Sequence, residues 1–154
     1  MPNKPARREP ARPIRILLVE DNDAHTKLIL RAFEEDRLVN SVDCVCDGEQ
    51  ALDYLYQRGN YSDPAKSPRP DMVLLDLKLP KIDGIEVLRQ VKEDPNLREI
   101  PVVVLTSSTD QRDVHAAYRH YANSYIAKPI DFDKFRKVVD ELGYYWTIFN
   151  HPPR

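Results

Sequence analysis

The stretch Met72-Val-Leu-Leu-Asp-Leu-Lys-Leu-Pro-Lys-Ile-Asp-Gly84 decides the fold of this chain. Its first four residues are apolar and run directly into the carboxylate of Asp76, and Pro70 and Pro80 bound the run. An apolar run of this length between prolines is typical of a strand that is buried on both faces of a parallel sheet. Asp76 then stands at the carboxyl end of that strand, where open α/β sheets place their chemistry.

The composition indicates an ordinary folded domain. The chain has 154 residues, of which 42% are hydrophobic and 31% charged, a balance typical of globular proteins. The formal net charge of −2 gives no electrostatic reason to expect nucleic acid or an acidic membrane surface as a partner. No apolar run approaches the roughly 20 residues of a membrane span, and the N-terminus lacks the apolar core of a signal peptide. We therefore expect a cytoplasmic protein.

Cysteines and glycines exclude several classes of site. The two cysteines, Cys44 and Cys46, are one residue apart and supply neither a disulfide framework nor a zinc site. We expect both thiols to be buried as small apolar side chains. The chain has only four glycines, none of them clustered, whereas a P-loop or a dinucleotide-binding loop needs several glycines close together.

Five apolar stretches of strand length alternate with five amphipathic stretches of helical spacing between residues 14 and 142. Such alternation predicts βαβ units and a doubly wound, five-stranded parallel sheet covered on both faces, with strand order 2-1-3-4-5 as in flavodoxin-like folds. Residues 1–13, rich in proline and arginine, are expected to be a flexible tail, and residues 143–154 a C-terminal arm. The expected strands are 14–19, 41–46, 72–76, 101–106 and 124–127.

The helices between these strands carry recognisable start signals. Asn22 or Asp23 can cap the first helix and Asp47 the second, which runs to about Gln57, because short polar side chains satisfy free amides at helix starts. Ser108 with Gln111 forms a possible capping box for the fourth helix. Residues 58–69 form an unusually long loop, which indicates a functional surface or a tolerated insertion.

Polar side chains follow four of the five strands. Glu20 and Asp21 come after the first strand, Asp76 ends the third, Thr106 the fourth and Lys128 the fifth. The carboxyl ends of parallel strands lie at the same edge of the sheet, so the three carboxylates there should lie close together. They repel one another unless a cation neutralises them, and an all-oxygen cluster suits Mg²⁺ or another divalent cation. A hydroxyl and an ammonium beside it can hold the oxygens of a phosphoryl group. Taken singly, each residue also suits a helix cap or a surface position.

Several segments resemble the motifs of response-regulator receiver domains. Thr106 follows Asp76 by 30 residues and Lys128 follows Thr106 by 22, close to the spacing of that family. The resemblance covers about residues 14–142, which we expect to form one receiver domain. The matching segments are Ile16-Leu-Leu-Val-Glu-Asp-Asn22, Val73-Leu-Leu-Asp-Leu-Lys-Leu-Pro80 with Asp83-Gly84, Val104-Leu-Thr-Ser107 and Tyr125-Ile-Ala-Lys-Pro129.

The resemblance implies that Asp76 accepts a phosphoryl group from the phosphohistidine of a sensor histidine kinase. Glu20, Asp21 and Asp76 are then expected to hold Mg²⁺, with the main-chain carbonyl of Lys78 completing the protein ligands. The protein is expected to act as a phosphoacceptor with slow autodephosphorylation rather than as a turnover enzyme.

The resemblance also implies how the signal is read. Thr106 and Lys128 bind the phosphoryl oxygens, and Tyr125 is the aromatic residue that changes orientation together with Thr106. The Lys128–Pro129 bond is expected to be cis. The side chains of Lys78 and Ser107 depart from common family residues beside the acceptor, so the lifetime of the phosphorylated state is left open.

No effector domain is expected after Leu142. The aromatic stretch Tyr144–Phe149 either packs on its own last helix or pairs with another subunit. Together with the long 58–69 loop, it resembles the single-domain response regulators that partner bacterial phytochromes. A homodimer is therefore expected through the arm and the face formed by the fourth helix, fifth strand and fifth helix, with output by protein contact or by onward phosphoryl relay.

Three alternatives compete with the receiver. A haloacid-dehalogenase-type phosphatase needs a second acid two residues after the nucleophile, where Lys78 stands. A flavodoxin needs a hydroxyl-rich phosphate loop after the first strand, where this chain has Glu20-Asp21-Asn22-Asp23. A degenerate receiver that acts only as an adaptor has no need of the complete acid set. All four histidines, His25, His115, His120 and His151, are expected at the surface.

Overall fold

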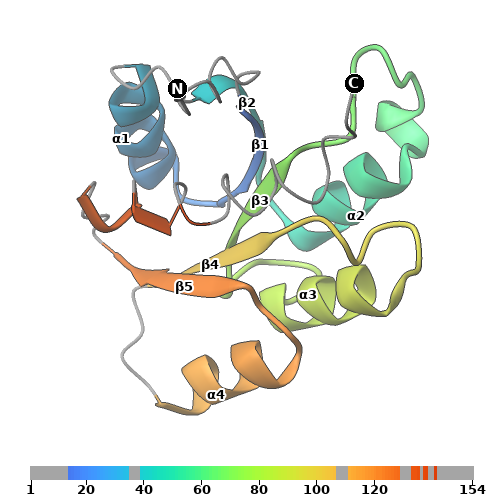
Figure 1. The fold of residues 1–154 in the computed structure, drawn as a ribbon. Helices are drawn as coiled ribbons and strands as arrows, with labels where there is room; N and C mark the ends of the chain where they lie inside the picture. Colours follow the sequence, from blue (N-terminus) through green and yellow to red (C-terminus); the bar gives the residue numbers. More distant parts are fainter. Residues whose placement is uncertain are drawn as a thin grey trace, which may run out of the picture.

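A computed structural model describes residues 14–34, 39–106 and 111–128, and residues 133–135, 137, 138 and 141 near the C-terminus. The five described strands form one sheet in the order β2-β1-β3-β4-β5, and every neighbouring pair is parallel, as Figure 1 shows. The doubly wound architecture predicted from the sequence is thereby confirmed. The strands are β1 Ile14–Val19, β2 Val39–Val45, β3 Met72–Asp76, β4 Val102–Thr106 and β5 Ser124–Ala127.

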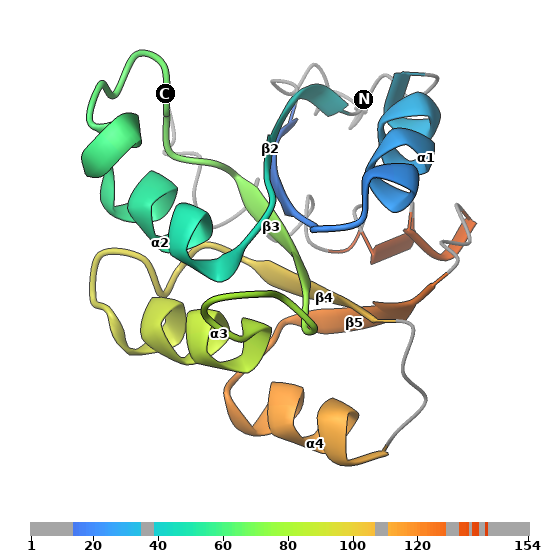
Figure 2. The same ribbon diagram turned by 180° about the vertical axis from the view of Figure 1, so that it is seen from behind.

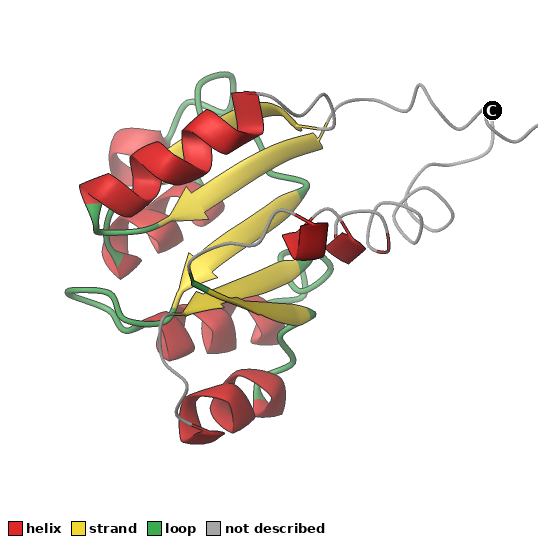
Figure 3. Cartoon of the chain, turned by 90° about the vertical axis from the view of Figure 1, so that its left-hand side faces the viewer, coloured by secondary structure: helices red, strands yellow, loops and turns green. Residues whose placement is uncertain are grey.

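Helices join these strands and cover the sheet from both sides, as the rear view in Figure 2 and the side view in Figure 3 show. Residues 133–135, 137, 138 and 141 are helical, in the region of the expected last helix, whereas Ser108 of the expected capping box lies outside the described residues. Among the described residues, no helix combines the length and apolar character that a bilayer crossing requires. The bounds are α1 Asp23–Glu34, α2 Gly48–Tyr56, the 3₁₀ turn η2 Gly59–Tyr61, α3 Gly84–Glu93 and α4 Gln111–Arg119.

The core consists of two apolar clusters, one on each face of the sheet. Leu17 and Val19 pack with residues of α2 and α3, whereas Ile16 and Leu18 pack with Ile29 of α1. Successive strand residues point to opposite faces, so β1 serves both clusters. All five residues of β3 are buried, which is the doubly covered strand that the apolar run before Asp76 predicts.

Side-chain caps begin the first two helices where the sequence places them. Asn22 Oδ1 accepts a hydrogen bond from the backbone N–H of His25 at 3.0 Å, and Asp47 Oδ1 accepts one from Gln50 N–H at 2.7 Å. Each cap satisfies an amide that has no partner within the helix. These contacts fix the direction in which α1 and α2 leave the carboxyl edge of the sheet.

The expectation that Cys44 and Cys46 are buried is wrong, because both thiols are exposed. The opposite face of β2 is the covered one: Asp43 accepts a hydrogen bond from the Tyr54 hydroxyl of α2, and Asp47 is buried. Cys44 and Cys46 therefore lie on the other side of this segment, away from α2. Because β2 is an edge strand with β1 as its one neighbour in the sheet, a small side chain on its outer part stays open to solvent.

The long connection after α2 is partly packed against the domain. It begins with η2, and the Gln57 side chain donates a hydrogen bond to the Ser67 carbonyl at 2.9 Å. Ser67 is buried, and Arg69 donates to the Asn96 carbonyl at 2.6 Å. These contacts hold the loop at the end of the domain from which β3 starts.

Candidate functional site

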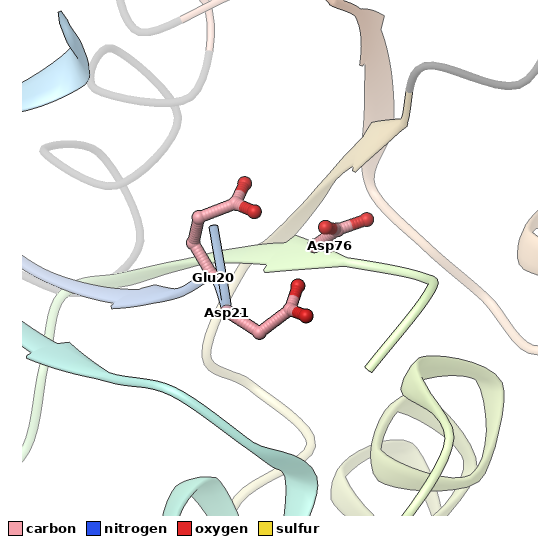
Figure 4. Close-up of side chains that lie close together, drawn as sticks. All are labelled: Glu20, Asp21 and Asp76. Carbon is pink, nitrogen blue, oxygen red and sulfur yellow. The ribbon is translucent and has the colours of Figure 1, made fainter. Parts of the chain in front are cut away.

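Three carboxylates meet at the carboxyl edge of the two central strands. Glu20, Asp21 and Asp76 each offer one oxygen, and these oxygens lie within 4.8 Å of one another. Figure 4 shows Glu20 and Asp21 at the end of β1 beside Asp76 at the end of β3. The pairing of β1 with β3, in which Val19 lies opposite Leu75, brings the acids together across the chain.

Lys128 reaches the same cluster from the end of β5. Its Nζ donates to Glu20 Oε1 at 2.5 Å and to Asp76 Oδ2 at 3.2 Å. The three side chains are only 8%, 1% and 9% exposed, for Lys128, Glu20 and Asp76 respectively. Charges this deeply buried are tolerated when they are paired and hydrogen-bonded. A single ammonium, however, faces three carboxyl groups, so the cluster keeps an excess of acid.

The environment of Asp76 disfavours its charged form. Burial raises the pKa of the Asp76 carboxyl above its ordinary value, and the nearby Glu20 charge raises it further. The backbone N–H of Lys78, which donates to Asp76 Oδ1 at 3.1 Å, and the Lys128 ammonium act in the opposite direction. A further cation would relieve the remaining repulsion, and three converging carboxylate oxygens are ligands that hard divalent cations prefer. The donor set therefore fits a divalent metal ion.

A pocket opens beside the acid cluster. The loop between β3 and α3 forms most of its wall, and Asp21 contributes the opposite side. The side chain of Lys78 is exposed, while the backbone of this residue borders the pocket. The lining residues are Asp21, Leu77, Lys78, Leu79, Pro80, Asp83 and Ile85.

The walls of this pocket are fixed by a close contact with α2. Gly48 N–H donates to the Pro80 carbonyl at 3.4 Å, and a Cβ atom at position 48 would lie only 2.0 Å from the Ile82 carbonyl oxygen. Lys81 has a left-handed backbone with φ of 68°, and its Nζ lies 3.6 Å from Asp47 Oδ2. The residue before α2 and the start of that helix therefore hold the loop that carries Lys78.

The remaining expected site residues are described to different extents. Thr106 ends β4 opposite Ala127, and the structure describes its backbone alone. Ser107 and the Lys128–Pro129 bond lie outside the described residues. Tyr125 is half-buried against the cluster of α2 and α3, and its ring meets that of Tyr118 edge-on, with 6.3 Å between centroids and 89° between planes.

The expected surface position of His25 agrees with its partly exposed side chain, but the sequence did not predict its contact with the acid cluster. Its Nδ1 lies 3.1 Å from Lys128 Nζ and 3.7 Å from Glu20 Oε2, with the side chain 42% exposed. The signal in the sequence was its position three residues after the cap Asn22, which places it in the first turn of α1 at the same edge as the acids. His115 is exposed and His120 half-buried, and His151 lies outside the described residues.

This arrangement of strands and acids is that of a receiver, and the comparison with protein families agrees. The family model of the response regulator receiver domain matches residues 16–140. The chain belongs to the response-regulator receiver family, whose members act in phosphoacceptor signalling. The resemblance predicted from the sequence is confirmed.

The relatives narrow the class further. The chain is 48% identical to FilR2 of Methanothrix harundinacea, over 92% of this chain and 88% of that protein. It is 40% identical to the response regulator Rcp1 of Synechocystis sp., over 85% of this chain and 87% of Rcp1. The solved structure of the bacteriophytochrome response regulator AtBRR is 45% identical, with a TM-score of 0.77, over 88% of this chain and 96% of AtBRR. The chain is thus similar to phytochrome response regulators.

One solved structure of a relative contains a metal ion. Rcp1 has been solved in an Mn²⁺-bound form, which covers 92% of this chain and 100% of that one at 38% identity, with a TM-score of 0.72. Receiver domains hold a divalent cation in their acidic pocket. The three converging carboxylates of this chain are a donor set of the same chemical kind.

Proposed function

We propose that Asp76 is the phosphoacceptor of this receiver. The observation that carries the proposal is the position of one carboxylate, Asp76, between an ammonium at 3.2 Å and two further acids. Asp76 is buried, and the pocket lined by its neighbours Leu77 and Lys78 and by Asp21 is the proposed route for a donor. A carboxylate held in this way is positioned for attack on a phosphorus atom, and positioning supplies a large part of the catalysis of such transfers.

The proposed reaction is direct transfer of a phosphoryl group from a phosphohistidine of the kinase to Asp76. A lone pair of an Asp76 carboxylate oxygen forms the new O–P bond as the P–N bond of a phosphohistidine on the kinase breaks. The phosphohistidine ring reacts with a proton on its other nitrogen, so that the electron pair of the P–N bond returns to the ring and the histidine leaves in its neutral form. The product is an aspartyl phosphate, whose hydrolysis by water returns Asp76 to its free form. Slow autodephosphorylation of this kind makes the protein a timed switch rather than a turnover enzyme.

The proposed metal is Mg²⁺, held by Glu20, Asp21 and Asp76 together with the main-chain carbonyl of Lys78. When bound, the ion supplies positive charge that neutralises the acids and the phosphoryl oxygens. The buried Glu20, held by Lys128, keeps the cluster in place, while the exposed Asp21 faces the pocket. Loss of any one carboxylate is expected to weaken metal binding.

The proposed response to phosphorylation involves three residues on β4 and β5. Thr106 and Lys128 bind phosphoryl oxygens, and Thr106 is drawn towards the new charge. Tyr125 then turns into the space that Thr106 leaves, which breaks its edge-on contact with Tyr118 of α4. The surface of α4, β5 and the last helix changes as a result, and a coupling of about 1–3 kcal/mol is enough for a useful switch.

The proposed partners follow from the relatives. AtBRR and RtBRR are described as bacteriophytochrome response regulators, so a sensor histidine kinase of the phytochrome class is the proposed donor in the cytoplasm. A homodimer is proposed through the C-terminal arm of residues 143–154 and the face of α4, β5 and the last helix. Output then passes by protein contact or by onward phosphoryl relay.

One experiment tests the phosphoacceptor directly. The protein is incubated with acetyl phosphate and Mg²⁺, and intact-mass spectrometry is expected to show the addition of one phosphoryl group that chelation of Mg²⁺ prevents. Asp76→Asn is expected to abolish the addition. Asp53→Asn is the matched control, because Asp53 lies on α2 and pairs with Arg58, and it should be phosphorylated normally. An undiminished mass gain in Asp76→Asn would overturn the assignment.

A further inference from the structure

His25 of α1 contacts Lys128, the lysine that hydrogen-bonds both Glu20 and Asp76. Its Nδ1 lies 3.1 Å from Lys128 Nζ, although 103 positions separate the two residues. The backbone N–H of His25 is bound by the Asn22 cap at 3.0 Å, so the start of α1 is fixed where the ring can face Lys128. This contact is not required by the fold, because the core of α1 is formed by Ile29 and Phe33 further along the helix.

The donors of Lys128 are fully used in this arrangement. An ammonium has three N–H donors and no acceptor, and Nζ meets Glu20 Oε1 at 2.5 Å, Asp76 Oδ2 at 3.2 Å and His25 Nδ1 at 3.1 Å. Because an ammonium Nζ can only donate, a hydrogen bond at this distance requires His25 Nδ1 to be the acceptor. The three acceptors come from β1, β3 and α1, so they hold the ammonium from three sides.

We propose that His25 is a positioning residue that holds the Lys128 ammonium in place during phosphoryl transfer, an inference that rests on the proposed role of Asp76. When Asp76 becomes an aspartyl phosphate, its carboxyl group loses its negative charge. The N–H that Lys128 gives to Asp76 Oδ2 then turns to a phosphoryl oxygen. The hydrogen bonds from Lys128 to Glu20 and His25 remain, so the Lys128 side chain keeps its conformation during the transfer. Donors that are fixed before the reaction stabilise developing charge most effectively.

The competing account is that His25 is protonated and pairs with Glu20, whose Oε2 lies 3.7 Å from Nδ1. In that case Nδ1 carries a proton and faces the Lys128 ammonium at 3.1 Å, which places two cations against each other. The shorter distance and the donor inventory of Lys128 favour the neutral acceptor. The two accounts differ in the number of protons on the ring, which can be measured.

A pair of variants separates the hydrogen bond from the bulk of the ring. His25→Leu removes the acceptor at similar size, and it is expected to slow phosphorylation by acetyl phosphate about threefold to tenfold, the factor that one hydrogen bond supplies. His25→Asn offers an oxygen near the place of Nδ1 and is expected to restore the rate to within about twofold of wild type. His115→Leu is the matched control, because His115 is an exposed histidine on α4, and its rate should be unchanged.

The ring itself provides a readout that does not depend on phosphorylation. Nitrogen-15 NMR of the full chain is expected to show neutral His25 with the proton on Nε2, and Lys128→Met is expected to shift the Nδ1 resonance. Equal rates in wild type and His25→Leu, or a ring protonated on both nitrogens at neutral pH, would overturn the inference. Failure of Asp76 to be phosphorylated in any variant would instead reject the proposed function, and the NMR result would still decide the contact.

Discussion

The ammonium of Lys128 lies 3.2 Å from the carboxylate of Asp76, although the residues are 52 positions apart. They stand at the ends of β5 and β3, and β4 lies between these strands in the sheet. The lysine side chain therefore crosses one strand at the carboxyl edge of the sheet. This reach makes the site depend on the pairing of three strands.

Lys128→Met should affect both chemistry and stability. Loss of the ammonium removes a donor for the phosphoryl oxygens, and we expect phosphorylation by acetyl phosphate to slow by about 100-fold, as for other donors that stabilise a developing anion. Without metal, Glu20 is left buried without its partner, so the midpoint of urea unfolding should fall. Lys66→Met is the control, because Lys66 is exposed in the long loop. A normal rate in Lys128→Met would contradict the site.

Asp76→Asn should stabilise the metal-free protein. Burial raises the pKa of Asp76 above its ordinary value of 3.8, so the folded protein binds this proton more tightly than the unfolded chain. The contribution of Asp76 to stability is therefore present at low pH and is lost as the pH rises through the window above 3.8. We expect the variant to gain about 0.5–2 kcal/mol in free energy of unfolding near neutral pH, and less at pH 4.

Urea titrations of both proteins in chelator, at several pH values, measure that gain. Adding Mg²⁺ should reduce it, because the ion relieves the repulsion in the wild-type site and stabilises whatever form it binds. A gain that is the same at every pH would show that Asp76 is not the titrating group.

Gly48→Ala should loosen the pocket from a position outside it. Alanine normally favours a helix over glycine, yet its Cβ would lie 2.0 Å from the Ile82 carbonyl oxygen. The clash should cost about 1–3 kcal/mol of stability and displace the loop that carries Lys78, which lowers the affinity for Mg²⁺ in calorimetry.

Gly59→Ala is the matched control for that substitution. Gly59 has a φ of 61°, and its nearest contact to a new Cβ would be Asp53 Oδ2 at 3.5 Å. This variant pays a backbone cost of about 1 kcal/mol but leaves the pocket untouched, so its Mg²⁺ affinity should match wild type. Reduced affinity in both variants would mean that general destabilisation, rather than the loop, is responsible.

Lys78→Ala should change the lifetime of the phosphorylated state while phosphorylation remains possible. The Lys78 side chain is exposed beside the acceptor, near the path of attacking water, whereas its backbone N–H bonds Asp76 whatever the side chain. The loss of phosphoryl group after removal of acetyl phosphate gives the rate. Equal lifetimes in wild type and variant would defeat this prediction.

Removal of residues 144–154 should convert a dimer into a monomer. The deleted segment includes four aromatic residues of the arm, and an apolar segment of this kind gains by pairing with a second copy. Sedimentation velocity of both chains, with and without phosphorylation, measures the mass. An unchanged mass after truncation rejects the arm as the dimer contact.

Most of the fold and part of the site could be predicted because the relevant signals are local. The apolar run before Asp76 marked a doubly buried strand, and the acids stood directly at strand ends. The exposure of Cys44 was not predicted, because residue type alone does not show which part of an edge strand a helix covers. The position of the His25 ring depends on the direction of α1 relative to the sheet. The contact of Gly48 with Ile82 joins two segments that are far apart in the sequence. Neither leaves a periodic pattern in the sequence.

The sheet order has a mechanical consequence for signalling. Glu20 and Asp76 follow β1 and β3, and each of these strands is hydrogen-bonded to a neighbour on both sides, whereas the four residues of β5 pair with β4 alone. The backbone at Tyr125 is therefore held by fewer inter-strand hydrogen bonds than the backbone that carries the acids. A proposed shift at Asp76 would be accommodated at this outer strand with less disruption of the sheet than at β1 or β3.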